Sequence, residues 1–197
     1  MLAFLGVAHC CLFYFIQDNL NKIDTKMIYK NAHQKPTAHH PNMEIKPELV
    51  VLHYTATTSM AQTLHILNAR RLSVHFVLSH NGKIFQLLDT EKKAWHAGAS
   101  CFQDRDNVND FSIGIELINP GFYKKKSFWR YGWSVQAGRK WGNWPRQQLN
   151  SLNTLLLWIR SQHPQCKHVV GHNEIAPGRK MDPGPLFPWS KIKRYKI

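Results

Sequence analysis

Three polar side chains stand at the ends of apolar segments or inside them. His53 follows "VVL", Glu116 lies inside "IGIEL", and His172 follows "VVG". A charged carboxylate inside a buried strand is costly unless a counter-charge or hydrogen bonds compensate it. Two histidines and an aspartate that together hold a divalent metal ion would offset this cost. Their nitrogen and oxygen donors suit zinc, which takes three protein ligands and leaves a fourth position for water.

The aspartate is supplied by the stretch "GHNEIAPGRKMDPGPLFPW", residues 171–189, which contains His172, Lys180 and Asp182. This stretch holds four prolines and three glycines. A simple turn needs only one such residue, so the composition indicates a long loop with a fixed backbone path. We therefore expect the loop to hold the three polar side chains near one another.

Simpler interpretations of the same residues stay open at this point. The spacing alone is weak support for a metal site, because 119 residues separate His53 from His172 and the chain contains twelve histidines. A single histidine is more often a core or surface residue than a ligand. The polar residues of the loop could also serve only to solvate it.

Apolar periodicity predicts the elements that must position these residues. Five short runs are typical of buried or half-buried strands, and two of them flank Asn81-Gly82, which predicts a hairpin. Two segments carry apolar residues at helical spacing: Leu64 and Leu67 in the first, and Leu149, Leu152, Leu156 and Ile159 in the second. The expected strands are 48–54, 73–79, 83–89, 111–119 and 167–172, and the expected helices are 60–71 and 145–163.

This mixture of strands and helices predicts an α/β fold, in which helices flank a central mixed β-sheet. With 197 residues, of which 43% are hydrophobic, the chain can bury one substantial core, so we expect a single domain. Only 19% of the residues are charged, which argues against general disorder.

The formal net charge of +14 is concentrated in the second part of the chain. The residues up to Pro120 carry +1 and those after it carry +13. Such a field favours an anionic partner: a nucleic acid, a membrane surface or an acidic cell-wall polymer. No helix-turn-helix, zinc-finger or aromatic RNA-binding signature accompanies the charge, so no nucleic-acid partner is expected.

The first residues, "MLAFLGVAHCCLFYFIQDN", are apolar from Met1 to Ile16, which is the length of a signal-peptide core and short for a membrane span. We interpret them as an export or anchor segment, although no Lys or Arg precedes Lys22. A hydrophobic helix packed on the domain is the alternative. The expected organisation is a segment at 1–20, a polar linker at 21–47 and the functional domain at 48–197. Among the cysteines, Cys101 and Cys166 are isolated, which supports no cysteine metal site and leaves a single bridge open.

From about residue 48 to 192 the chain resembles the zinc-dependent N-acetylmuramoyl-L-alanine amidases, which are related to phage lysozyme-amidases and animal peptidoglycan recognition proteins. Five segments carry the resemblance in order: "VVLHYTAT", "SVHFVLSHNGKIFQLLD", "AWHAG", "NDFSIGIELINPG" and "VVGHNEIAPGRKMDPGPLFPW". The last is the most specific. Through "DPGPLFPW" the chain looks most like the periplasmic, lipoprotein-type branch, although the lipid-attachment motif of that branch is not evident.

The resemblance implies that His53, His172 and Asp182 bind one zinc ion per chain. Glu116 matches the catalytic acid/base and Lys180 matches the residue that stabilises the oxyanion. The implied reaction is hydrolysis of the amide between the lactyl group of N-acetylmuramic acid and L-alanine, in peptidoglycan or muropeptides. Wall turnover, remodelling or recycling would use it, and the implied location is the bacterial periplasm or cell envelope, with the cytoplasm as the alternative.

The rival function is a peptidoglycan-binding module that recognises without cutting. Members of the wider fold family lose hydrolysis when a metal ligand is replaced, whereas all five implied positions are filled here, which favours the enzyme. His75 and His96 are expected to support the site or the fold rather than to bind metal. Trp95 either lines the groove or packs.

Residues 122–146 form an insertion between the strand of Glu116 and the long helix. It contains four of the seven tryptophans and seven Lys or Arg residues. One interpretation is a rim that stacks sugars on indole faces and attracts an anionic wall or membrane surface. The other is that the tryptophans build a small satellite core.

Overall fold

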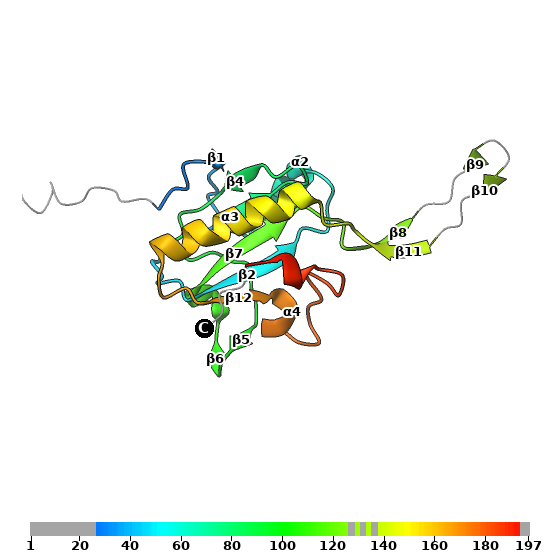
Figure 1. Cartoon of the computed structure of the whole chain (residues 1–197). Coiled ribbons are helices and arrows are strands. Elements are labelled where there is room, and N and C mark those ends of the chain that lie inside the picture. Colours follow the sequence, from blue (N-terminus) through cyan, green and yellow to red (C-terminus); the bar gives the residue numbers. More distant parts are fainter. Residues whose placement is uncertain (1–26, 126–128, 131–132, 135–137, 194–197) are drawn as a thin grey trace, which may run out of the picture.

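The computed structural model describes residues 27–125, 129–130, 133–134 and 138–193 (Figure 1). The expected export or anchor segment, residues 1–20, lies outside these residues. Within the described ranges, no helix is both long enough and apolar enough to cross a membrane.

A mixed six-stranded sheet forms the centre of the molecule, as predicted, with the strand order β1-β4-β3-β7-β2-β12. Only the β3–β4 pair is antiparallel, and the other four neighbours in the sheet are parallel. The strands are β1 (His33–Gln34), β2 (Leu49–Tyr54), β3 (Phe76–Leu78), β4 (Ile84–Gln86), β7 (Ser112–Leu117) and β12 (His168–Gly171).

Helix α3 (Arg146–Gln162) lies across one face of this sheet (Figure 1). The four positions predicted from its helical spacing are all buried, and Pro145 is its N-cap residue. They pack on one set of alternating strand residues, including Val50 and Leu52 of β2 and Ile113 and Ile115 of β7. Because side chains alternate along a strand, the other residues of β2 and β7 point to the opposite face.

That opposite face is covered by the segment that precedes β7 and by the short helix α4 (His172–Ile175). Leu49 and Val51 of β2 pack there against Val108, Phe111 and Ile175. By the same alternation, His53 of β2 and Ser112, Gly114 and Glu116 of β7 belong to this face. The remaining short elements are β5 (Cys101–Phe102), β6 (Arg105–Asp106), η1 (Val108–Asp110) and η2 (Trp189–Lys191).

The predicted local elements are present but are shorter at their ends. The hairpin predicted around Asn81-Gly82 is formed by β3 and β4, and Gly82 has a positive φ of 81°. Helix α2 (Met60–Ala69) begins after Ser59, whose hydroxyl accepts a hydrogen bond from the Gln62 N–H. The last predicted strand stops at Gly171, because α4 begins at His172.

The linker predicted over 21–47 differs from the structure in its described part, residues 27–47. Tyr29 is buried and its ring lies 5.0 Å from that of Trp158 on α3. The Tyr29 N–H donates to Gln86 Oε1, and the Gln86 amide donates to the Met27 carbonyl. Tyr29, Ile45 and strand β1 therefore attach this segment to the domain, which a reading based on its polar composition could not anticipate.

In its described residues, the insertion forms paired β-strands that lie away from the body of the domain (Figure 1). Its base pairs β8 (Phe122–Lys125) with β11 (Gly138–Trp141), and its outer part pairs β9 (Trp129–Arg130) with β10 (Trp133–Ser134). At the base, the Trp141 ring lies 6.3 Å from Tyr54 and would touch a Cβ at Gly184. Trp144 packs at 4.9 Å from Phe187. These two tryptophans therefore belong to the body of the domain.

Candidate metal centre

Three polar atoms from distant parts of the chain form a small triangle at the end of the parallel strands. The Nδ1 atoms of His53 and His172 are 2.9 Å apart, and each is 2.9 Å from Oδ2 of Asp182. All three residues are at least 92% buried, which leaves little access for water. The two histidines and the aspartate predicted from the sequence are thus brought together.

Strand register and helix position explain this convergence. His53 on β2 stands directly beside Glu116 on β7, and Leu52 stands beside Gly171 on β12. His172 follows Gly171 as the first residue of α4, so its ring reaches the same edge of the sheet as His53. Parallel strands end at a common edge, which makes this edge the natural place for a site.

The loop after α4 carries Asp182 back to this edge. The Asn173 N–H donates to the Asp182 carbonyl, at 3.0 Å, and thereby ties the loop to the helix. Pro183 lies so close to Gly171 that a Cβ there would be 2.7 Å from its Cδ. The loop therefore follows a path defined by packing, as its proline and glycine content predicts.

The environment of the triangle favours a neutral His53 ring and an ionised Asp182. Burial lowers the pKa of His53, because removal from water disfavours the imidazolium. Burial also opposes the charge of Asp182, but the adjoining His172 and His53 rings outweigh it and hold the pKa of Asp182 well below its usual range. The centre therefore carries a fixed negative charge on Asp182.

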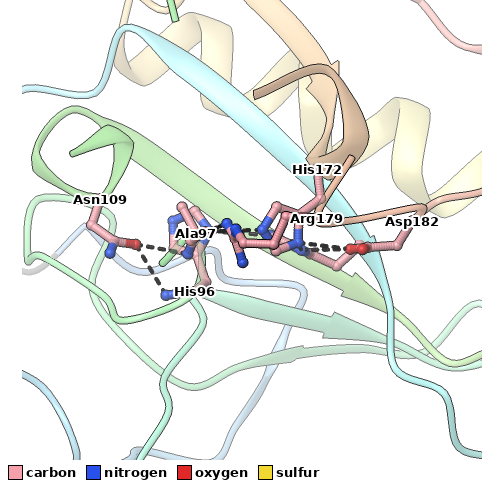
Figure 2. Close-up of polar contacts among 7 residues, drawn as sticks. His96, Ala97, Asn109, His172, Arg179 and Asp182 are labelled. Atoms are coloured by element: carbon pink, nitrogen blue, oxygen red, sulfur yellow. Dashed lines mark hydrogen bonds and ion pairs between the residues drawn. The ribbon is translucent and has the colours of Figure 1, made fainter. Parts of the chain in front are cut away.

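The hydrogen bond that His172 makes outside the triangle suits a metal ligand. His172 Nε2 lies 2.9 Å from the carbonyl oxygen of Ala97, and a carbonyl can only accept, so Nε2 carries the hydrogen (Figure 2). In a neutral ring the Nδ1 lone pair then faces the triangle. Arg179 donates to the same carbonyl at 2.7 Å and holds it in place. Two imidazoles and a carboxylate of this kind suit zinc or a similar divalent ion.

Glu116 lies beside the triangle, in surroundings that disfavour its ionised form. Burial raises the pKa of Glu116 to about 8; the negative charge of Asp182 adds to the rise and Lys180 opposes it. Its buried Oε2 atom makes no hydrogen bond to any residue that the structure describes. Glu116, Lys180 and the triangle line one pocket, with Lys180 exposed at its edge. The five residues singled out in the sequence are therefore assembled together.

The other histidines and Trp95 occupy different positions. His96 stands behind His53, at 3.1 Å between its Nδ1 and Nε2 of His53. His75 is fully buried, and within the described part of the chain its ring bonds only to backbone, through the Gly114 N–H and the Lys92 carbonyl. Trp95 is 39% exposed, with the Lys93 ammonium over its ring. Neither His96 nor His75 reaches the metal triangle.

Sequence reasoning missed several residues that surround the centre. Asn109 and Ser112 bond to His96, Arg179 bonds to Ala97, and Tyr54 and Arg70 line the pocket. Asn109 and Ser112 do lie in the family-like segment "NDFSIGIELINPG", which was the available signal. The bridge left open between Cys101 and Cys166 is not formed, because Cys101 is exposed, Cys166 is buried and both are free thiols.

The fold and the site together define the class: an α/β domain of the amidase and peptidoglycan recognition protein type, with a candidate metal centre at the end of its parallel strands. Residues 43–185 match the family model described as N-acetylmuramoyl-L-alanine amidase. The chain therefore belongs to this family, which confirms the resemblance seen in the sequence.

Several relatives agree with this assignment. AmiD of Escherichia coli, described as an N-acetylmuramoyl-L-alanine amidase, is 36% identical over 159 residues, which is 76% of this chain and 53% of AmiD. The structure of E. coli AmiD with the substrate anhydro-N-acetylmuramic acid-L-Ala-D-γ-Glu-L-Lys matches with a TM-score of 0.63 and 32% identity, over 80% of this chain and 58% of that one. A crystal structure of an AmpD derivative matches with a TM-score of 0.64 and 25% identity, over 87% and 98% of the two chains. The chain spans about half the length of the curated relatives it matches.

Proposed function

We propose that the chain is a zinc-dependent amidase that hydrolyses the bond between the lactyl group of N-acetylmuramic acid and L-alanine. The observation that carries this proposal is the buried His53–His172–Asp182 triangle beside Glu116, in a member of a family described by this activity. The AmiD complex with an anhydromuropeptide supports a substrate of this class. A peptidoglycan-binding module without activity would have no use for a carboxyl group whose pKa is raised beside three metal-type donors.

Each residue of the centre has a defined part in the proposed reaction. His53, His172 and Asp182 would hold the zinc, which lowers the pKa of water and polarises a carbonyl. Glu116 lies next to His53, and a carboxyl group with a raised pKa readily takes up and returns a proton. It would accept the proton of the attacking water and deliver it to the departing alanine nitrogen. Lys180 would offset the negative charge that develops on the substrate oxygen.

The pocket and the surface next to it suit a muropeptide. Arg70 and Tyr54 line the pocket together with the five central residues. A shallow, mostly apolar groove along α2 adjoins the pocket and shares Ala56 and Ile66 with it. Apolar sugar faces and peptide side chains fit such a groove, and the Arg70 guanidinium suits the carboxylates of a stem peptide.

The proposed place of action is the bacterial periplasm or cell envelope. Two features of the sequence support it: the apolar residues 1–20 and the charge of +13 after Pro120, which favours an anionic surface. We expect purified sacculi as well as small muropeptides to bind.

The decisive test is turnover of a defined muropeptide by zinc-loaded wild type and by Glu116→Gln, with products identified by mass spectrometry. The variant should keep its zinc and its fold but lose about 10²- to 10⁴-fold in turnover, the usual contribution of a general acid–base group. Lys180→Ala should lose about 10²- to 10³-fold. Wild-type turnover by Glu116→Gln would remove Glu116 from the mechanism. Firm binding without turnover by the wild type would show a recognition module instead.

A further inference from the structure

His53 can bind a metal through Nδ1 only if its hydrogen is on the other ring nitrogen. In a neutral imidazole one nitrogen carries the hydrogen and the other carries the lone pair. Nδ1 of His53 belongs to the metal triangle, whereas Nε2 points away from it toward Nδ1 of His96, at 3.1 Å. The position of the hydrogen on His96 therefore decides which nitrogen of His53 holds the lone pair.

A chain of hydrogen bonds with a fixed direction settles this question. The Ser112 hydroxyl lies 2.6 Å from the Val108 carbonyl oxygen, which can only accept, so the single hydroxyl hydrogen is used there. Ser112 Oγ must then accept from Nε2 of His96, at 3.1 Å. A neutral imidazole carries a single hydrogen, which His96 holds on Nε2, so its Nδ1 keeps a lone pair.

Nδ1 of His96 is consequently an acceptor, and Nε2 of His53 must be the donor to it. We infer that His96 and Ser112 are positioning residues, which fix the orientation and the protonated nitrogen of His53 so that its Nδ1 lone pair faces the metal. This inference rests on the proposed metal site. It assigns a function to two residues that lie outside that site.

Ala97, the residue after His96, fixes the protonated nitrogen of the second histidine ligand, His172, in the same way. The Ala97 carbonyl accepts from Nε2 of His172 and leaves Nδ1 of His172 free. Asn109 holds both residues of this segment, because its Oδ1 accepts from the His96 N–H at 3.0 Å and from the Ala97 N–H at 2.9 Å (Figure 2). One dipeptide, His96-Ala97, therefore orients both histidine ligands.

Strand β7 provides the space that His96 requires. A Cβ at Gly114 would lie 2.5 Å from Cγ of His96, so the ring rests directly against the glycine backbone. Ser112, two residues earlier on the same face of the strand, is fully buried and offers its hydroxyl to the same ring. The pattern Ser-x-Gly-x-Glu of β7 thus serves the site at three successive inward positions.

Zinc affinity of His96 variants tests this inference, measured by competition with a chelator. His96→Phe keeps a ring of similar size but removes the acceptor, and should weaken zinc binding about 10- to 100-fold, the usual effect of losing such a partner. His96→Asn restores an acceptor oxygen near the position of Nδ1 and should recover most of the loss. His163→Phe is the matched control, because His163 is a buried histidine bonded to Thr90. It should bind zinc as the wild type does.

Nitrogen-15 NMR of the histidine side chains gives a second readout, in the zinc-free protein and without any reference to activity. His53, assigned with a His53→Gln variant, should carry its hydrogen on Nε2 in the wild type and become a mixture of tautomers in His96→Phe. Equal zinc affinity in wild type and His96→Phe, or equal losses in His96→Phe and His96→Asn, would overturn the inference. Absence of zinc binding by the wild type would instead refute the proposed function, while the NMR result would still decide the tautomer of His53.

Discussion

Asp182 is the single negative charge among the three ligand atoms of the centre. We expect Asp182→Ala to abolish both zinc binding and hydrolysis, because two neutral imidazoles alone bind zinc weakly and the fixed carboxylate is lost. Metal analysis after gel filtration, alongside a turnover assay, measures both effects. Asp110→Ala is a suitable control, because Asp110 is a carboxylate paired with Lys93 away from the triangle. Full zinc occupancy in Asp182→Ala would refute its assignment as a ligand.

His75 makes the domain sensitive to acid. Burial lowers the pKa of His75 to about 4, whereas its value in the unfolded chain is near 6.5. Between these two values the unfolded chain binds a proton that the folded protein does not bind. The contribution of His75 to stability is therefore complete above pH 6.5, decreases as the pH falls and levels off near pH 4, with a total change of about 3 kcal/mol.

The free energy of unfolding of the zinc-free protein in urea, measured at pH 7.5 and pH 5, tests this prediction. The difference between the two pH values should be smaller in His75→Gln than in the wild type, because one of the titrating groups has been removed. Other buried histidines, including His53 and His96, should keep part of the dependence in both proteins. An identical difference in both proteins would contradict the assignment to His75.

At the scale of elements, the register of the β8–β11 ribbon pairs basic positions with one another. Arg139 stands directly opposite Lys124, and the register places Lys125 and Lys140 next to them. A run of basic positions along one ribbon gives it a positive charge, which favours an anionic partner. The ribbon starts beside Tyr54, which lines the pocket, so a polymer held by the ribbon would lie close to the centre.

We predict that changing these four residues to Gln lowers activity on whole sacculi more than on small muropeptides, and reduces the salt dependence of the activity on sacculi. Turnover measured on both substrates at low and high salt tests this prediction. The control removes the same charge from four exposed lysines elsewhere: Lys30, Lys35, Lys46 and Lys167. If the control loses as much activity on sacculi as the ribbon variant, overall charge rather than the ribbon is responsible.

At the scale of the whole molecule, the segment 27–47 is part of the domain. Tyr29 joins the same hydrophobic core as α3, so Tyr29→Ala should lower the free energy of unfolding by about 3 kcal/mol. Its neighbour Ile28 is 41% exposed, and Ile28→Ala should change stability by less than about 0.5 kcal/mol. Equilibrium unfolding in urea compares the two variants. A Tyr29→Ala protein as stable as the wild type would mean that the segment is only a linker after all.

The sequence by itself determined the elements and the candidate ligands. Strand and helix positions follow from periodicity, which is a local property, and the buried residues of α3 were predicted correctly for this reason. His53, Glu116 and His172 stood out because polar side chains are costly in apolar strands. Lys180 and Asp182 stood out through the composition of their loop and through the family resemblance, and the structure brings all five to one pocket.

Only the tertiary structure decided which groups surround the ligands and which group donates in each hydrogen bond among them. The contacts of His53 with His96, of His96 with Ser112 and of His172 with Ala97 join residues that are 16 to 75 positions apart. The attachment of Tyr29 to Gln86 spans 57 positions. No local pattern encodes such pairs, because the direction of a hydrogen bond depends on where both partners lie in space. Composition suggested a polar linker over 21–47, but in its described part, 27–47, two apolar side chains and a few backbone hydrogen bonds hold the segment on the domain.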